Sequence, residues 1–468
     1  MNFASRIAFV VAAASGFVSC DIQRAPEPEA QSRPDILWIV SDTLRASYLG
    51  IYGAEHDPSP NLDRFARENL IFRRAISPAP WTSPAVASLF TALYPGAHGV
   101  ARDSVQSRIP TDALPRSHRT LAEHFSEAGY ATSAIIQNPW VSGRRGYGQG
   151  FERFVDAGQL RSDHPMGFLH TRNLGKIARE EIRTLQADPR PFFFYLHFLD
   201  PHRPFTAPRE LVDRFHPKGA NRPRNPTSLA KLTDEIANYR AEIVVVDETI
   251  GSLFEFLRKE GLYEDLIIAF TSDHGEQFFD HGHLGHGHDL YSEEVHVPFF
   301  LKAPGLSGEV DSVVSTLDIG PTLLELAGIE AMPDVQGLAL TRDLEERKRR
   351  GVLTEATMRR NLKAYVAHDG LKLIVEFEGV STDIVDENAE RETVGLFDWN
   401  VDVKEKNPIK DRVRSEALRQ KLYEQLAQST ELRSGAAGAS VTLDPATVEA
   451  LKSLGYGETD GAPNAGTR

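Results

Sequence analysis

Three apolar segments of strand length, each ending in acidic or histidine side chains, constrain the fold of this 468-residue chain most strongly. They are 35–42 (DILWIVSD), 191–202 (PFFFYLHFLDPH) and 266–274 (LIIAFTSDH). Continuous apolar runs of this length are typical of strands buried on both faces of a parallel sheet. Because ligands bind at the carboxyl ends of such strands, we expect Asp42, Asp200, His202, Asp273 and His274 at one functional edge.

The segments between and after these strands complete an α/β pattern. Apolar residues recur every three or four positions across 239–257, which predicts a long amphipathic helix packed on the sheet. After about residue 350, two strands are predicted around Asp369-Gly370, followed by a strand near 394–399 and a helix over 414–426. We therefore predict a catalytic domain over 35–349 and a small C-terminal α+β subdomain over 350–433.

The charge balance limits the kinds of partner. The chain carries 52 Lys and Arg against 66 Asp and Glu, a formal net charge of −14. A negative chain is poorly suited to broad nucleic-acid binding, so we expect no nucleic-acid partner. An anionic substrate would need local positive charge, which a bound metal ion supplies. The oligomeric state is left open.

The first 34 residues have the composition of an export signal and tether. An apolar run over 7–18 follows Arg6, and this run is too short to span a bilayer. Phe17-Val-Ser-Cys20 resembles a bacterial lipobox, and Cys20 is the only cysteine. We expect a signal peptide over 1–19, a lipidated Cys20 and tether over 20–34, and a protein anchored in the bacterial envelope facing the periplasm. An ordinary signal peptide, and hence secretion, is the alternative. At the other end, 434–468 reads as a linker, a short helix and a flexible tail.

A threonine is predicted at the start of a helix. In 80–91 (PWTSPAVASLFT), Pro84 suits a first helical turn, and Thr82 therefore lies at or just before the helix N-terminus. Unpaired N–H groups there favour an anion and lower the cost of forming an alkoxide. The alternative is that Thr82 or Ser83 only caps the helix.

A histidine-rich segment follows Asp273. Six of the 16 histidines lie between 274 and 296, in a stretch punctuated by glycines. Imidazole together with carboxylate suits zinc or manganese. We expect His281, His283 and His296 to be mainly structural.

Several ordered motifs resemble the sulfatase family of the alkaline phosphatase superfamily, from about Pro34 to Tyr456. They are Asp42 after the first strand, 82–95 (TSPAVASLFTALYP), 195–204 (YLHFLDPHRP), 270–276 (FTSDHGE) and 318–324 (DIGPTLL). The resemblance implies an alkaline-phosphatase-like α/β domain, with a mixed, mostly parallel sheet between helices. It also implies a small C-terminal α+β domain with an antiparallel sheet.

The resemblance also implies roles for individual residues. Thr82 takes the nucleophile position, and the implied metal ligands are Asp42, Thr82, Asp273 and His274. The implied contacts to substrate or leaving group are His202, His286 and His288, with Gln137 and Asn138 facing the transferred group.

The chain departs from sulfatases proper at the nucleophile. In sulfatases proper, a cysteine or serine in a Cys/Ser-x-Pro-x-Arg context is oxidised to formylglycine. This chain has Thr82 at that position, and Val86 stands where the arginine should be. Threonine cannot yield that aldehyde. His274 also stands where calcium-type arylsulfatases have asparagine, which favours zinc or manganese over calcium. These differences resemble the phosphodiesterase, phosphonate-ester and lipid-headgroup transferase branches of the superfamily.

We therefore predict a metal-dependent hydrolase that cleaves phosphate, phosphodiester or phosphonate esters through Thr82. The alternatives are a sulfatase using unmodified Thr82, a phospho-headgroup transferase and a non-catalytic anion-binding lipoprotein. A second metal could be held by Asp200, His202 and either His286 or His288. We expect one ion, because the sulfatase pattern uses the positions of His202 and His286 as substrate contacts.

Overall fold

The computed structural model of the chain describes residues 33–100, 113–160, 169–216, 228–341, 349–378, 390–433, 447–449 and 451. The predicted signal peptide, Cys20 and most of the tether lie outside the described residues, as does most of the predicted C-terminal linker and tail. Of the helices within these ranges, none combines the length and apolar character needed to cross a membrane.

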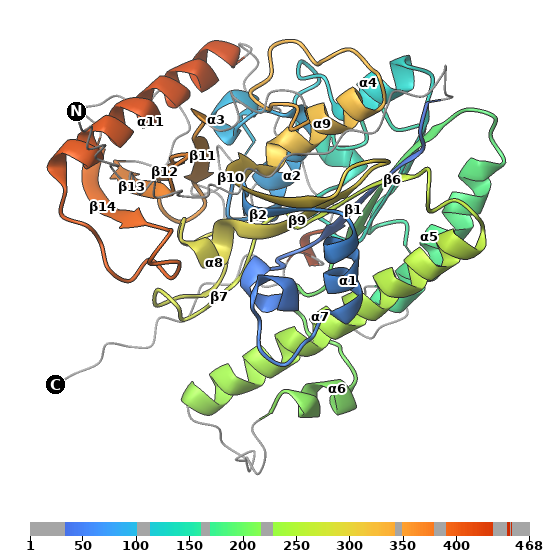
Figure 1. Cartoon of the computed structure of the whole chain (residues 1–468), viewed down its shortest axis with the longest axis horizontal. Helices are drawn as coiled ribbons and strands as arrows, with labels where there is room; N and C mark the ends of the chain where they lie inside the picture. The colour runs from blue at the N-terminus through green and yellow to red at the C-terminus, as the bar shows by residue number, and fades with distance from the viewer. Residues whose placement is uncertain are drawn as a thin grey trace, which may run out of the picture.

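An eight-stranded mixed sheet organises the larger part of the chain (Figure 1). Its strand order is β10-β2-β9-β6-β1-β5-β3-β4, and every neighbouring pair is parallel except the two that β9 makes with β2 and β6. The strands are β1 (Ile36–Ser41), β2 (Leu70–Ile76), β3 (Ala131–Ile136), β4 (Arg153–Val155), β5 (Phe192–Phe198), β6 (Ile267–Thr271), β9 (His296–Lys302) and β10 (Gly308–Ser315).

Helices cover both faces of this sheet, because its central strands are apolar on both sides (Figure 1). On β1, Trp38 and Val40 pack with one helical layer, whereas Leu37 and Ile39 pack with the other. The first layer contains α2 (Thr82–Thr91), α4 (Leu121–Glu127) and α9 (Ile319–Leu326). The second contains α1 (Pro60–Glu68), α5 (Thr171–Gln186) and α7 (Ser228–Lys259).

A separate antiparallel sheet lies in the C-terminal part, in the order β11-β12-β13-β14. One of its faces packs under α11 through Leu373, Leu422 and their neighbours. The other face packs against residues of the large sheet, such as Ile76 and Val313. These elements are β11 (Val352–Ala356), β12 (Leu362–Val366), β13 (Leu371–Phe377), β14 (Glu390–Asp398) and α11 (Arg412–Leu432).

The loops near the carboxyl edge of the large sheet contain short helices and strands. The histidine-rich segment contains the hairpin of β7 (Gln277–Phe278) and β8 (Leu284–Gly285), followed by α8 (Ser292–Val295). The remaining short helices are α3 (Pro95–His98), α6 (Arg209–Arg214), η1 (Ala46–Tyr48), η2 (Gly50–Tyr52), η3 (Gly143–Arg145) and η4 (Thr316–Asp318).

The predicted fold class is confirmed. The predicted amphipathic helix over 239–257 lies within α7, and the predicted hairpin turns at Gly370, whose φ of 88° suits glycine. The domain boundaries at 349 and 433 stay predictions.

Candidate active site

The site forms where β6, β1 and β5 lie side by side and end at one edge of the sheet. Asp42 follows β1, and its N–H donates to the carbonyl of Phe198 on β5 at 3.0 Å. Asp273 follows β6, two residues after the strand ends. His197 lies on β5 itself. Parallel strands in register therefore bring these three side chains together, although they are more than 70 residues apart in the sequence.

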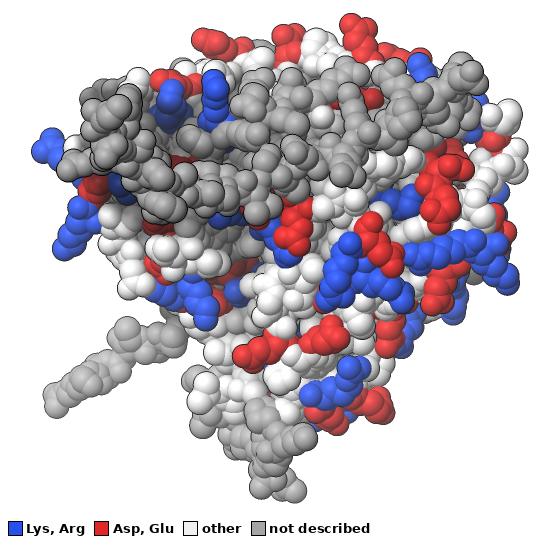
Figure 2. Space-filling view, viewed as in Figure 1, with Lys and Arg blue, Asp and Glu red and all other residues white. Residues whose placement is uncertain are grey.

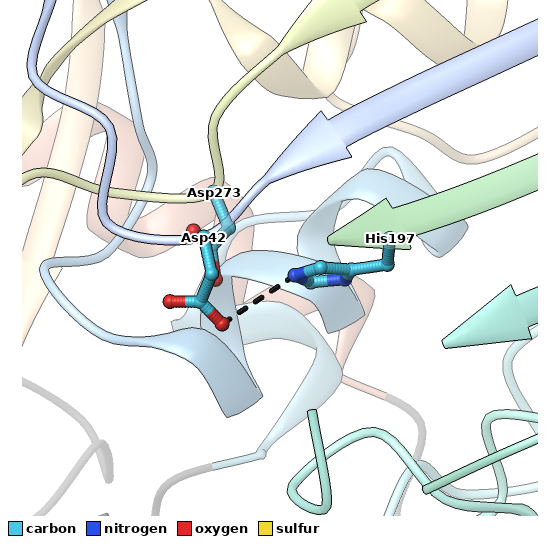
Figure 3. Close-up of side chains that lie close together, drawn as sticks. All are labelled: Asp42, His197 and Asp273. Carbon is cyan, nitrogen blue, oxygen red and sulfur yellow. Dashed lines mark ion pairs between the residues drawn. The ribbon is translucent and has the colours of Figure 1, made fainter. Parts of the chain in front are cut away.

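The three side chains form a fully buried group whose ligating atoms lie within 4.8 Å of one another (Figure 3). His197 points its imidazole at Asp42, with 3.4 Å between Nε2 and Oδ2. Among the described residues, Asp42 Oδ1, Asp273 Oδ2 and His197 Nε2 have no hydrogen-bond partner. Buried polar atoms without partners are costly, and a divalent cation would satisfy all three. The residues present therefore fit a metal ion.

The charges at the site point to the same conclusion. Burial, and then the neighbouring Asp273, raises the pKa of Asp42 well above its usual range. The ion-pair partners of Asp42 and Asp273 within the described ranges are histidines, not Lys or Arg. A cation would offset the repulsion between these two carboxylates. Burial also lowers the pKa of His197 to about 4, so its ring is neutral near pH 7, as a metal ligand must be.

His274 directs one ring nitrogen at the same point. Its Nδ1 donates to the carbonyl of Gly275 at 2.8 Å, which leaves the lone pair on Nε2. That Nε2 lies 3.6 Å from both Asp42 Oδ1 and Asp273 Oδ2. A Cβ at position 275 would lie 2.1 Å from the carbonyl oxygen of Glu293, so only glycine fits after His274. Imidazole and carboxylate ligands together suit zinc or manganese.

Thr82 begins α2 and is fully buried beside this cluster. Its Oγ1 lies 3.2 Å from His274 Nε2 and 3.3 Å from Asn138 Nδ2. The neighbouring Ser83 hydroxyl instead bonds to the hydroxyl of Tyr147 at 2.9 Å. Of the two hydroxyls, Thr82 is the one in contact with the candidate metal-binding side chains.

The backbone after Asp42 is held in a conformation that costs energy. Thr43 has a φ of 57°, in the left-handed region that β-branched residues avoid. Its N–H donates to Asp273 Oδ1 at 3.2 Å, and its carbonyl accepts from the Tyr239 hydroxyl at 2.6 Å. These bonds stabilise the turn that brings Asp42 and Asp273 together.

The two predicted amide contacts have different surroundings. Asn138 Nδ2 donates to Asp42 Oδ2 as well as approaching Thr82. Gln137 donates to the carbonyl of Leu169 at 2.7 Å and accepts from the N–H of Leu199 at 2.9 Å. Its amide therefore holds two loops together, and a substrate contact by Gln137 stays a prediction.

His202 and His286 lie beside the cluster; His202 is buried, and 10% of the His286 side chain is exposed. The ring of His286 is 4.5 Å from that of His274 and 5.1 Å from that of His202. Burial, and then the neighbouring His286, lowers the pKa of His202 to about 3, and burial also lowers the pKa of His286. The ring of His288 stacks on that of His283 at 4.6 Å.

Asp200 was predicted to share a second metal site with His202 and His286 or His288, but its charged neighbour is the buried Glu242. Burial raises the pKa of Asp200 to about 6. Burial, and then the charge of Asp200, raises the pKa of Glu242 on α7 well above its usual range. Asp200 is not among the three residues that form a metal-type group in the described part of the chain. The second metal at Asp200, His202 and His286 or His288 stays a prediction.

Sequence reasoning missed His197 and Glu276. His197 lies on the buried strand β5, within the apolar run 191–202. A single histidine in that strand was the signal that could have identified it. Glu276 completes the segment 273–276 (DHGE), and its Oε2 accepts from His286 Nδ1 at 2.7 Å.

Comparisons with known proteins identify relatives of this chain. Residues 34–329 match the family described as sulfatase, and residues 279–432 match the C-terminal region of N-sulphoglucosamine sulphohydrolase. An ulvan-active sulfatase of Formosa agariphila is 27% identical over 345 residues, covering 68% of this chain and 66% of the relative. A multifunctional alkaline phosphatase superfamily protein of Trinickia caryophylli is 26% identical over 410 residues, covering 68% and 78%.

Solved structures share the fold. A protein solved in complex with its substrate D-glucosamine-2-N,6-O-disulfate superposes with a TM-score of 0.69 at 19% identity, covering 86% of this chain and 99% of that one. The phosphonate monoester hydrolase of Agrobacterium radiobacter superposes with a TM-score of 0.66 at 21% identity, covering 85% and 96%.

Proposed function

The chain belongs to the sulfatase family, whose members are metal-dependent ester hydrolases, and we propose that this one cleaves phosphorus esters through Thr82. One observation carries the proposal. A threonine that cannot become formylglycine presents its hydroxyl, 3.2 Å from His274 Nε2, to a buried cluster of carboxylate and imidazole. An unmodified hydroxyl in that position suits a nucleophile that forms a phosphothreonine intermediate.

The proposed reaction has two displacements. Thr82 Oγ1 bonds to phosphorus as the bond to the leaving oxygen breaks, the hydroxyl proton is lost, and the departing alcohol gains a proton. Water, or an acceptor alcohol in a transferase, then cleaves the phosphothreonine and restores the hydroxyl. When bound, the metal ion supplies charge that lowers the hydroxyl pKa and offsets negative charge on the phosphoryl oxygens.

The remaining side chains have proposed positions around this reaction. Asp42, Asp273 and His274 would hold the ion, with His197 as a further donor. Asn138 donates a neutral hydrogen bond beside Thr82. His202 and His286 serve the leaving oxygen. The donor set favours zinc or manganese over calcium.

A second candidate function is a sulfatase that uses unmodified Thr82. It is favoured by the relatives, because the ulvan-active enzyme and others of similar identity act on sulfate esters. A phospho-headgroup transferase would use the same first step. A non-catalytic anion-binding protein is opposed by the intact constellation of Asp42, Thr82, Asp273 and His274.

A paired substrate panel separates these functions. We expect kcat/KM for at least one of an aryl phosphate, a phosphodiester and a phosphonate monoester to exceed that of the matched aryl sulfate by about tenfold or more, since the proposed nucleophile and donor set suit phosphoryl transfer. Purified protein loaded with zinc or manganese is assayed with esters that share the same leaving group. Sulfate turnover well above that of all phosphorus esters would establish the second candidate instead.

Cellular placement is a separate proposal. The lipobox-like segment ending in Cys20 supports an anchor in the bacterial envelope, with the catalytic domain facing the periplasm. An anionic ester is the proposed substrate. On the face shown in Figure 2, basic and acidic side chains are interspersed over the described surface, so its overall charge gives no indication of the substrate.

A further inference from the structure

We propose that Glu276 is a positioning residue that holds the two leaving-group histidines, His286 and His202, against the reacting centre. This inference rests on the proposed function, in which those histidines serve the departing oxygen. Glu276 lies within the segment 270–276 (FTSDHGE), but no role was predicted for it from the sequence. It lies two positions after His274, and its side chain is 4% exposed.

The contact with His286 is direct. Glu276 Oε2 accepts the Nδ1 proton of His286 at 2.7 Å. This bond fixes the ring plane and places the Nδ1 proton on the side of the carboxylate, so the Nε2 edge is the one directed elsewhere. The same ring stands 4.5 Å from that of His274, whose Nε2 reaches Thr82 Oγ1. Glu276 therefore sets the orientation of a ring at the edge of the reacting centre.

The contact with His202 is indirect and passes through Arg203. Glu276 Oε1 lies 3.8 Å from Arg203 Nη1, and the same guanidinium pairs with Glu235 at 2.9 Å. The carbonyl of Arg203 in turn accepts from His202 Nδ1. One carboxylate thus contacts His286 directly and the side chain of Arg203, the residue whose backbone carbonyl bonds to His202.

The backbone of Glu276 is held by Arg45. The backbone carbonyl of Glu276 accepts from Arg45 Nη1 at 3.2 Å, and the Arg45 guanidinium also pairs with Asp280 at 2.8 Å. The bond from Arg45 fixes the backbone from which the Glu276 side chain extends to its partners, which supports a positioning role.

Glu294 offers a matched control for a merely structural acid. It is also fully buried in the histidine-rich segment, but it accepts backbone N–H groups from His288 and Asp289, and the side-chain amide of Gln277. Its carboxylate therefore holds the backbone of the loop at His288 and Asp289. Loss of Glu294 should weaken the loop without favouring one leaving group.

The test compares two esters that share the reacting group and differ in the leaving alcohol, one 4-nitrophenol and one a poor alkyl leaving group. Assistance to the departing oxygen matters mainly for the poor leaving group, and such assistance contributes about 10²-fold or more. We expect Glu276→Ala to lower kcat for the alkyl ester by about 10²-fold and for the nitrophenyl ester by about threefold or less, with little change in KM. Glu276→Gln keeps an acceptor oxygen but not the charge, so its kcat for the alkyl ester should lie between those of the unmodified enzyme and Glu276→Ala.

The readout is a ratio within each variant, so a smaller folded fraction does not alter it. Glu294→Gln should lower kcat for both esters by the same factor. Melting temperature and metal content are measured for every variant. An unchanged ratio in Glu276→Ala would overturn the proposal. The ratio is measured on whichever ester class the unmodified enzyme cleaves, so failure of the phosphorus-ester assignment and failure of the Glu276 proposal are seen separately.

Discussion

Replacing Thr82 with alanine is expected to lower kcat by at least about 10³-fold on every ester that the protein cleaves. The change removes the only hydroxyl that contacts His274 Nε2 and Asn138 Nδ2 in the described site. Water could still attack directly, but without a covalent intermediate the reaction would lose its positioned nucleophile. Steady-state kinetics on the best ester of the panel measure the effect.

Ser83→Ala is the matched control for this experiment. The Ser83 hydroxyl lies next in sequence but bonds to Tyr147 and not to the metal-binding group. We expect it to change kcat by about tenfold or less, with a small loss of stability from the broken hydrogen bond. Equal losses in Thr82→Ala and Ser83→Ala, or near-full activity of Thr82→Ala, would contradict the assignment of the nucleophile.

Removing the metal is expected to have the second large effect. Dialysis against a chelator should abolish measurable turnover, and zinc or manganese should restore it, because Asp42 and Asp273 would otherwise face each other without a cation. Asp273→Asn should lower metal content and activity together, by about 10²-fold or more in kcat. Elemental analysis and kinetics of the same preparations measure both quantities.

The number of ions is decided in the same experiment. We expect one equivalent per chain, unaffected by Asp200→Ala, since Asp200 has Glu242 as its acidic neighbour. Two equivalents that fall to one in Asp200→Ala would instead establish a binuclear centre. Full activity after complete removal of metal would contradict the proposed chemistry.

The central part of the fold was predictable because its signals are local. An apolar run that ends in an acid predicts a buried parallel strand and places its carboxylate at the functional edge, which is where Asp42 and Asp273 lie. Pro84, which suits a first helical turn, likewise predicted the helix that starts at Thr82. The hairpin at Gly370 was marked by its turn residues.

What could not be predicted depends on strand order and on contacts between distant segments. His197 becomes a partner of Asp42 only because β5 pairs with β1, and a strand does not reveal its neighbours in its own sequence. The antiparallel direction of β9 is set by its connections, not by its composition. The side-chain amide of Gln137 bonds to backbone groups of Leu169 and Leu199, which lie far from it in the chain.

The histidine-rich segment shows the same division. Its composition predicted a metal-site region, and His274 does direct Nε2 at the carboxylates. His281 instead bonds to Glu293 and to the carbonyl of Glu405, and His296 bonds to the carbonyl of Arg73. Structural roles were expected for both histidines, but their partners lie in other segments, and residue spacing does not encode those partners.

Trapping the covalent intermediate tests the central claim most directly. Enzyme mixed with excess phosphorus ester is quenched in acid within one turnover and digested, and the peptide that contains Thr82 is examined by mass spectrometry. The proposed mechanism predicts a phosphoryl group on Thr82 that appears with substrate, decays as substrate is consumed, and is absent from Thr82→Ala. Turnover of the ester while Thr82 stays unmodified at every quench time, with the phosphoryl group on another residue, would contradict it.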